Sequence, residues 1–200
     1  MFACGALMAI AFPALAQVDV ADEIEEIQVT ATRRPTSVRD VSAALTVIGT
    51  EEIARARLVT DSLAAKPGIF LQQTTPGQGA AIIRGLKGSE VLHLVDGFRL
   101  NNAIFRNAPT QYLALVAPGT LERVEIVRGA SASLYGSDAV GGVVQVLSRT
   151  PNRESAGAGG DAFLAFDTAD LSKILRGSVE FGNEKLAALV SGEYLETGDR

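Results

Sequence analysis

A strict two-residue alternation near the end of the sequence constrains the fold more than any other feature. Residues 171–181 place apolar side chains, Gly177 and Lys173 on one face and polar side chains on the other, with Ile174 as the exception. Residues 185–195 repeat the alternation, and Gly-Asn-Glu at 182–184 joins the two stretches. A period of two residues is typical of β-strands, and so short a connection predicts a hairpin. This region is therefore expected to form antiparallel sheet.

The length of these strands favours a membrane location. Together with residues 161–167 they form three stretches, two of them of about 9–11 residues, the strand length that outer-membrane barrels use. A soluble β-hairpin is the alternative for this segment alone. Three strands cannot close a barrel, and an open sheet edge is not tolerated in lipid. The sequence is therefore expected to be a fragment of a longer protein.

The start of the sequence is typical of a secretion signal. Residues 2–16 are apolar and end in Ala14-Leu15-Ala16, a small-residue cleavage site before Gln17. This stretch is too short to span a bilayer as a helix. We predict a signal peptide at residues 1–16 and export across a bacterial inner membrane; a buried N-terminal helix is the alternative. The lone Cys4 would be removed with it.

The rest of the chain predicts a small α+β domain between two less regular segments. Residues 17–43 are rich in acidic and polar residues and are expected to be flexible, apart from a β-prone run at 27–31. The domain is expected at 44–150, and residues 151–200 are expected to hold a linker and the alternating strands. Strands are predicted at 44–48, 69–73, 80–84, 91–96, 121–127 and 142–148, with short helices beginning at Thr50 and Thr60.

Composition and motifs argue against several functions. The formal net charge of -5 disfavours nucleic-acid binding. The single histidine, His93, alternates with Val91 and Val95 and is expected in the core. No set of residues with the spacing of a catalytic triad, a metal site or a nucleotide-binding loop is present. The sequence thus predicts neither an enzyme nor a bound cofactor.

A glycine- and serine-rich stretch, "GASASLYGSDAVGGVVQVLS" at 129–148, runs directly into a strand. This density of small residues indicates that backbone closely approaches other backbone, or adopts positive φ repeatedly. An ordinary solvent loop is the alternative, which the aromatic Tyr135 and the following strand pattern make less favourable.

Four motifs in order resemble the plug domain of TonB-dependent outer-membrane receptors. They are "EIQVTA" at 26–31, "IIRGL" at 82–86, "VLHLVDGFRLN" at 91–101 and "LERVEIVRGASASLYGSDAVGGVVQVLS" at 121–148. The resemblance implies an α+β plug with a mixed sheet and short helices, followed by the first strands of a truncated antiparallel transmembrane β-barrel. It also implies location in the outer membrane, contact with lipid, and TonB as the periplasmic partner. The function implied is energy-coupled import of a scarce ligand such as a ferric siderophore or haem.

The resemblance also implies roles for particular residues. The TonB box would comprise Glu26, Ile27, Gln28, Val29, Thr30 and Ala31, a strand that can add to the partner's sheet. Arg84 and Arg128 would pair with barrel glutamates, and we expect them on neighbouring strands of one sheet. The glycine-rich stretch would pack against the barrel wall. The ligand would face apical loops that contain Arg99, Asn101, Asn102, Arg106, Asn107, Gln111 and Tyr112.

A second interpretation keeps the docking strand and omits the pore. The chain would then be a periplasmic binding module, or the product of a degraded gene, that docks to TonB through its N-terminal strand without transporting anything. An enzyme is the third and least favoured class, because catalytic residue sets are missing. The length of alternating sequence encoded downstream would separate the first two.

Overall fold

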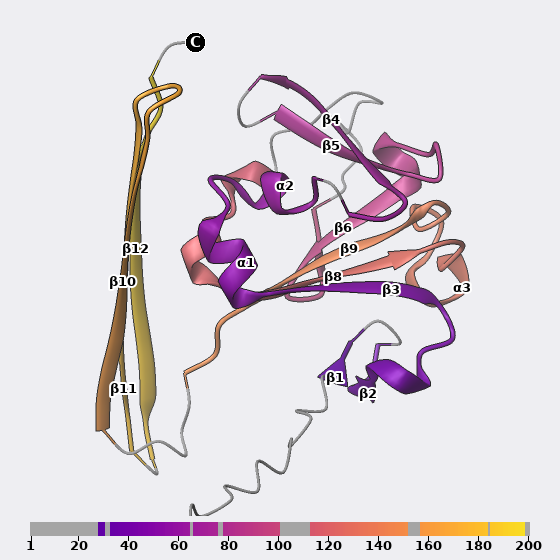
Figure 1. Ribbon diagram of the computed structural model, residues 1–200. Coiled ribbons are helices and arrows are strands. Elements are labelled where there is room, and N and C mark those ends of the chain that lie inside the picture. Colours follow the sequence, from indigo (N-terminus) through magenta and orange to yellow (C-terminus); the bar gives the residue numbers. More distant parts are fainter. Residues whose placement is uncertain are drawn as a thin grey trace, which may run out of the picture.

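The computed structural model describes residues 28–30, 33–64, 66–75, 78–100, 113–151, 157–183 and 185–198. The fold has two parts (Figure 1): a body of mixed sheet and short helices, and a long three-stranded sheet beside it. This confirms the predicted α+β domain followed by antiparallel strands. The predicted signal peptide lies outside the described residues. Within the described part of the chain, no helix combines the length and apolar character needed to cross a membrane.

The body is built on a five-stranded sheet with strand order β3-β8-β9-β6-β7. Strands β6 and β9 are parallel, and all other neighbours are antiparallel. The bounds are Ala44–Gly49 for β3, Val91–Val95 for β6, Phe98–Arg99 for β7, Leu121–Arg128 for β8 and Gly142–Ser148 for β9. His93 is buried in β6, as predicted. Apolar cover on both faces explains why the middle strands are almost continuously buried.

One face of this sheet is covered by two short helices and a hairpin. Glu51 and Glu52 lie in the first turn of α1, where acidic side chains favour a helix start, and Ile53 is its buried residue. The covering elements are α1 (Thr50–Arg55), α2 (Val59–Ser62), β4 (Ile69–Thr75) and β5 (Gln78–Ile83). Short 3-10 turns complete this side at η2 (Gly88–Glu90), η3 (Leu113–Leu115) and η4 (Pro118–Thr120). The larger of the two apolar clusters fills this side.

The opposite face is covered by the N-terminal segment. Strand β1 (Gln28–Val29) pairs with β2 (Thr36–Ser37), and η1 (Val38–Asp40) follows. Val29 is fully buried in the second apolar cluster, against which Val38 and Val41 also pack. We expected residues 17–43 to be a flexible segment. The structure instead uses three valines of this segment to cover one face of the central sheet.

The glycine-rich stretch folds back on the body itself. It forms the short helix α3 (Ala132–Tyr135), which ends at Gly136 with φ of 92°. A Cβ on Gly142 would stand 2.5 Å from the Val127 carbonyl oxygen, and one on Gly141 would stand 2.8 Å from Leu86 Cβ. The predicted close approach is present. The nearest atoms belong to the body, however, and not to the wall strands that we expected to meet it.

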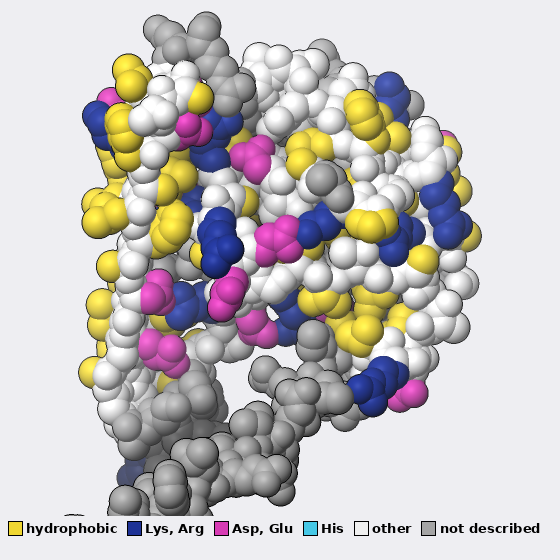
Figure 2. Space-filling model, viewed as in Figure 1, with side chains coloured by type: hydrophobic (Ala, Val, Ile, Leu, Met, Phe, Trp, Pro, Cys, Tyr) yellow, Lys and Arg dark blue, Asp and Glu magenta, His cyan; other side chains and the backbone are white. Residues whose placement is uncertain are grey.

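The second part is an antiparallel sheet with strand order β10-β11-β12. Its strands are β10 (Gly157–Asp167), β11 (Ser172–Gly182) and β12 (Ala187–Glu196), so β10 begins within the predicted linker. The alternation predicted for β11 is confirmed, because its polar side chains at Ser172, Arg176 and Ser178 are buried. Figure 2 shows apolar side chains along the outer edge of this sheet and charged side chains between it and the body. The outward residues include Leu164, Phe166, Leu175, Val179, Phe181, Val190 and Tyr194.

Candidate functional site

The N-terminal strand ends in a polar contact with the central sheet. The Thr30 backbone N–H donates to Glu125 Oε2 at 2.8 Å, and the Thr30 hydroxyl donates to the same oxygen at 3.1 Å. The Tyr135 hydroxyl donates to the Thr30 carbonyl oxygen at 3.0 Å. We call Glu125 and Tyr135 the strand seat. Thr30 thus has both backbone polar groups bonded to the strand seat, while Val29 fills the apolar cluster beside it.

The strand seat carries a buried charge. Glu125 is fully buried on β8, and Arg123 Nε lies 2.9 Å from its Oε1. The Arg33 guanidinium lies 5.2 Å from the centre of the Tyr135 ring. Burial, and then the Glu125 carboxylate, raise the pKa of Tyr135 above its ordinary value, so the hydroxyl keeps its proton and donates. A buried carboxylate needs such partners, and Thr30 of the N-terminal segment supplies two of the bonds.

The predicted docking strand is therefore partly engaged with the body of its own chain. Of its six residues, Gln28, Val29 and Thr30 are described, and Val29 pairs with Thr36 of β2. The remaining three, Glu26, Ile27 and Ala31, lie outside the described residues. The sequence alone did not indicate the strand seat, because Glu125 alternates with apolar residues on β8 like any solvent-facing position. Its burial depends on the N-terminal segment.

Arg84 and Arg128 do not lie on neighbouring strands, so that expectation is wrong. Arg84 follows β5, which pairs with β4 only, whereas Arg128 ends β8 of the central sheet. The Arg84 guanidinium lies over Gly129, where a Cβ would stand 3.0 Å from Nη1. Arg128 donates to the Pro67 carbonyl oxygen. The two side chains thus contact different partners, and their pairing with barrel glutamates remains a prediction.

Arg99 is the one described residue of the predicted ligand-facing set. It lies on β7, donates to the Tyr135 carbonyl oxygen, and forms an ion pair with Asp138 at 3.3 Å. Arg99 therefore holds the end of α3, next to the strand seat, and its contact with the ligand remains a prediction. The other six predicted residues lie outside the described part of the chain: Asn101, Asn102, Arg106, Asn107, Gln111 and Tyr112.

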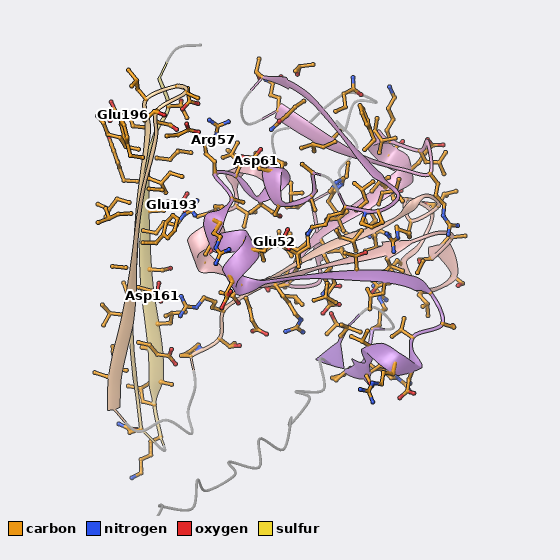
Figure 3. The ribbon with its side chains drawn as sticks, in the orientation of Figure 1. Glu52, Arg57, Asp61, Asp161, Glu193 and Glu196 are labelled. Carbon is orange, nitrogen blue, oxygen red and sulfur yellow. The ribbon has the colours of Figure 1, made fainter. Side chains whose placement is uncertain are left out.

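The sequence did not predict a charged contact between the body and the three-stranded sheet. Arg57 Nη1 of the body lies 2.5 Å from Asp170 Oδ2 of the sheet. Arg176 of β11 pairs with Glu193 of β12 within the sheet at 2.7 Å, and it reaches the body by donating to backbone carbonyl oxygens of residues 54–57. Lower on the sheet, Arg149 Nη1 lies 2.9 Å from Asp161 Oδ1. Figure 3 shows Arg57 on the body directed toward the sheet, with Glu193 and Asp161 facing the body. We call these three ion pairs, together with the residues 54–57 that Arg176 contacts, the wall contact.

Asp170 is the most strongly perturbed acid of the wall contact. It lies in the turn between β10 and β11, and its Oδ1 accepts from the Ser172 backbone N–H at 3.1 Å. Hydrogen bonding from Ser172, and then the Arg57 guanidinium, lower the pKa of Asp170 to about 2 against the opposing effect of burial. Asp170 therefore carries its charge, and the bond to Arg57, throughout the neutral range. Two charged groups more than 110 positions apart gave no local sequence signal.

A comparison with protein families matches residues 37–143 to the family described as TonB-dependent Receptor Plug Domain. The chain is 36% identical over 151 residues to a vitamin B12 transporter, BtuB, of Vibrio vulnificus strain CMCP6, covering 69% of this chain and 24% of that protein. It is 32% identical over 170 residues to the BtuB of Photobacterium profundum, covering 78% and 28% respectively. The chain thus spans about a quarter of the length of these curated relatives.

Solved structures of the same fold are also similar. A chain from the structure of the FpvAI–pyocin S2 complex superposes with a TM-score of 0.69 at 19% identity, over 84% of this chain and 21% of that one. The siderophore receptor PirA from Acinetobacter baumannii superposes with a TM-score of 0.62 at 24% identity, over 78% of this chain and 25% of that one. At this identity the likeness establishes the fold: a plug followed by initial barrel strands.

Proposed function

The chain belongs to the TonB-dependent receptor plug family, and from this premise we propose that it is the plug and first barrel strands of an outer-membrane receptor that imports a scarce ligand with energy delivered through TonB. The observation that carries the proposal is the pairing of the two parts. A plug with an N-terminal strand lies against the polar face of a sheet whose other face is apolar. That apolar face suits lipid, since outward apolar and inward polar alternation is how membrane barrels satisfy both environments.

The alternative of a periplasmic module without a pore fits this sheet less well. In water, β10–β12 would expose large side chains such as Leu164, Val190 and Tyr194, which are 76%, 67% and 58% exposed. Contiguous exposed apolar surface of this kind marks an interaction site or a membrane face. A lipid environment removes the problem without requiring a further protein.

For the ligand, we propose a corrinoid of the vitamin B12 class. The support is that curated relatives at 32–36% identity are named vitamin B12 transporters, whereas the siderophore receptor PirA, at 24%, supports the fold alone. This proposal replaces our expectation of a ferric siderophore or haem. Membrane vesicles carrying the receptor that contains this chain should bind cyanocobalamin saturably and at least tenfold more tightly than a ferric catecholate or haem. Preference for either competitor, with no cobalamin binding, would overturn this choice of ligand.

We propose that residues 26–31 bind TonB by strand pairing, and Val29→Pro tests this. Proline removes an N–H donor and fixes φ, so it should abolish capture of the receptor by immobilised TonB. The same change disturbs the pairing of Val29 with Thr36 and removes the valine side chain from the apolar cluster that holds the segment on the body. A loss of capture would therefore come from the altered strand itself, because release of the segment alone should make it more accessible to TonB.

Gln28→Ala is the matched control for this experiment. It keeps every backbone donor of the strand and should leave TonB capture within about twofold of the unsubstituted receptor. Normal capture of the Val29→Pro receptor, or equal loss with Gln28→Ala, would contradict docking through the backbone of this strand.

A further inference from the structure

The corner between α1 and α2, residues 54–57, presents backbone carbonyl oxygens at the end of a short helix. The last carbonyls of a helix lack partners within the helix and must find donors elsewhere. Arg176 of β11 supplies these donors. It donates to the Ala54 carbonyl oxygen, to that of Ala56 at 2.9 Å, and to that of Arg57 at 3.1 Å. One side chain of the wall sheet thus bonds three carbonyl oxygens of the plug backbone.

Arg176 is itself held firmly in the wall. Only 3% of its side chain is exposed, and Glu193 of β12 pairs with it while also accepting from the Gly119 backbone N–H at 3.3 Å. The Arg176 guanidinium lies 5.6 Å from the centre of the Phe163 ring on β10. A Cβ on Gly119 would stand 3.2 Å from Arg176 Cδ, so the close approach of η4 depends on this glycine. The Arg57–Asp170 pair ties the same corner a second time.

The segment that precedes the corner is held differently. Strand β3 is an edge strand of the central sheet and pairs with β8 alone. Strand β1 is held by β2 and by the strand seat. These contacts all lie within the plug. The chain therefore passes, at residues 50–54, from a segment bonded to plug sheet to a corner bonded to the barrel wall.

We propose that Arg176 is a positioning residue that fixes the 54–57 corner to the wall. When the plug is displaced from its N-terminal strand onward, the displacement then stops at this corner, which we call the joint. The role of this joint in transport rests on the proposed function, in which TonB binds residues 26–31 and pulls on them. An opening made by the departure of β1, β2 and β3 then forms beside β8, while the part of the plug against β10–β12 stays in place. Arg176 acts through the plug backbone and needs no contact with the ligand.

Force spectroscopy on the membrane-embedded receptor, pulled through a handle at the N-terminus, tests this joint without TonB. The unsubstituted receptor should yield first an event that releases residues 28–53, at most roughly 90 Å of extended chain. A second event at higher force should follow. In Arg176→Gln the first event should lengthen past the corner and merge with the second. General loss of stability would lower the forces and leave the length of the first event unchanged.

Two further variants make the result specific. Arg176→Lys keeps the charge opposite Glu193, but its three N–H donors cannot serve Glu193 and three carbonyl oxygens together, so the boundary should hold only partly. Lys173→Gln removes an ion pair, Lys173 to Glu196 at 3.1 Å, between the same two strands on the face away from the plug, and should change nothing. If Arg176→Gln fails to assemble, Asp170→Asn tests the second tie of the same corner and should lower the force of the second event.

The proposed joint would be wrong if the length of the first event were unchanged in Arg176→Gln, or if Lys173→Gln changed it equally. The outcome is separate from that of the proposed function. A receptor that shows the stepped release but does not bind TonB would retain the joint and lose its role in transport. A receptor that binds TonB and shows one continuous release would retain the role and lose the joint.

Discussion

The central sheet of the plug buries its apolar side chains, whereas the sheet β10–β12 exposes side chains of the same types on its outer face. Val124, Ile126 and Val144 of the central sheet are fully buried between helices, hairpin and N-terminal segment. On β11 and β12, Val179 and Val190 are more than half exposed, and it is Arg176 and Ser178 that are buried. The first sheet is stabilised by removing apolar surface from water. The second turns its apolar surface toward lipid and keeps polar bonds for its contact with the plug.

This difference teaches how the two parts can be joined without fusing their cores. A shared apolar core between plug and wall would bind them through many weak, non-directional contacts. The wall contact instead uses a few directional contacts at defined positions on the sheet: the Arg57–Asp170 pair near its upper turn, the bonds from Arg176 to the plug backbone at its middle, and the Arg149–Asp161 pair in its lower part. Directional contacts can hold one corner of the plug and leave other parts free to move.

The largest expected effect comes from breaking the central sheet. Ile126→Ala removes a fully buried side chain and should cost about 2–5 kcal/mol of plug stability, from lost transfer free energy plus the cavity. The matched change Val179→Ala, on the outer face of β11, should cost less than about 0.5 kcal/mol. Hydrogen exchange of the β8 and β9 amides in the detergent-solubilised receptor measures both. Similar effects of the two changes would contradict the opposite orientation of the two sheets.

A smaller effect should come from the strand seat, where polar contacts hold Thr30 beside the apolar cluster. Tyr135→Phe removes the hydroxyl that donates to the Thr30 carbonyl and should weaken the seat by about 0.5–1.5 kcal/mol. The readout is labelling of a cysteine placed at Val29, which should react up to about tenfold faster in the Tyr135→Phe background. Leu134→Ala, on an exposed side chain of the same helix, is the control and should leave labelling unchanged.

The parts of the fold that sequence predicted are those set by neighbouring residues. Two-residue alternation gave β11 and β12, and the acidic first turn gave α1, because both signals act within a few positions. The seating of Thr30 on Glu125 joins residues 95 positions apart, and Arg57 meets Asp170 across 113. The charge or polarity of one residue does not identify its partner when the two are so far apart in the sequence. The same limit explains the error on Arg84 and Arg128, since strand ends reveal little about which strands share a sheet.

The smallest expected effect is a loss of the Arg57–Asp170 ion pair of the wall contact at low pH. The folded-state pKa of Asp170 is lowered to about 2, below its ordinary value of 3.8. Its contribution is therefore complete above about pH 4 and is lost as pH falls through about 2. Spin labels at Glu51 and Lys173, both on exposed sites, report the distance between plug and wall.

That distance distribution should stay narrow down to about pH 3 and broaden toward pH 2. Asp61, Glu193 and Asp161 also present carboxylates at this contact, so the pH response of the whole is not that of Asp170 alone. The Asp170→Asn receptor separates the contribution of Asp170 from that of the other carboxylates. Its distance distribution should already be broader at neutral pH and should change less on acidification than that of the unsubstituted receptor. If both receptors broadened equally between pH 4 and pH 2, the tie would lie in the other carboxylates. If neither did, the bonds from Arg176 to the plug backbone, which do not titrate, would alone be enough to hold the corner.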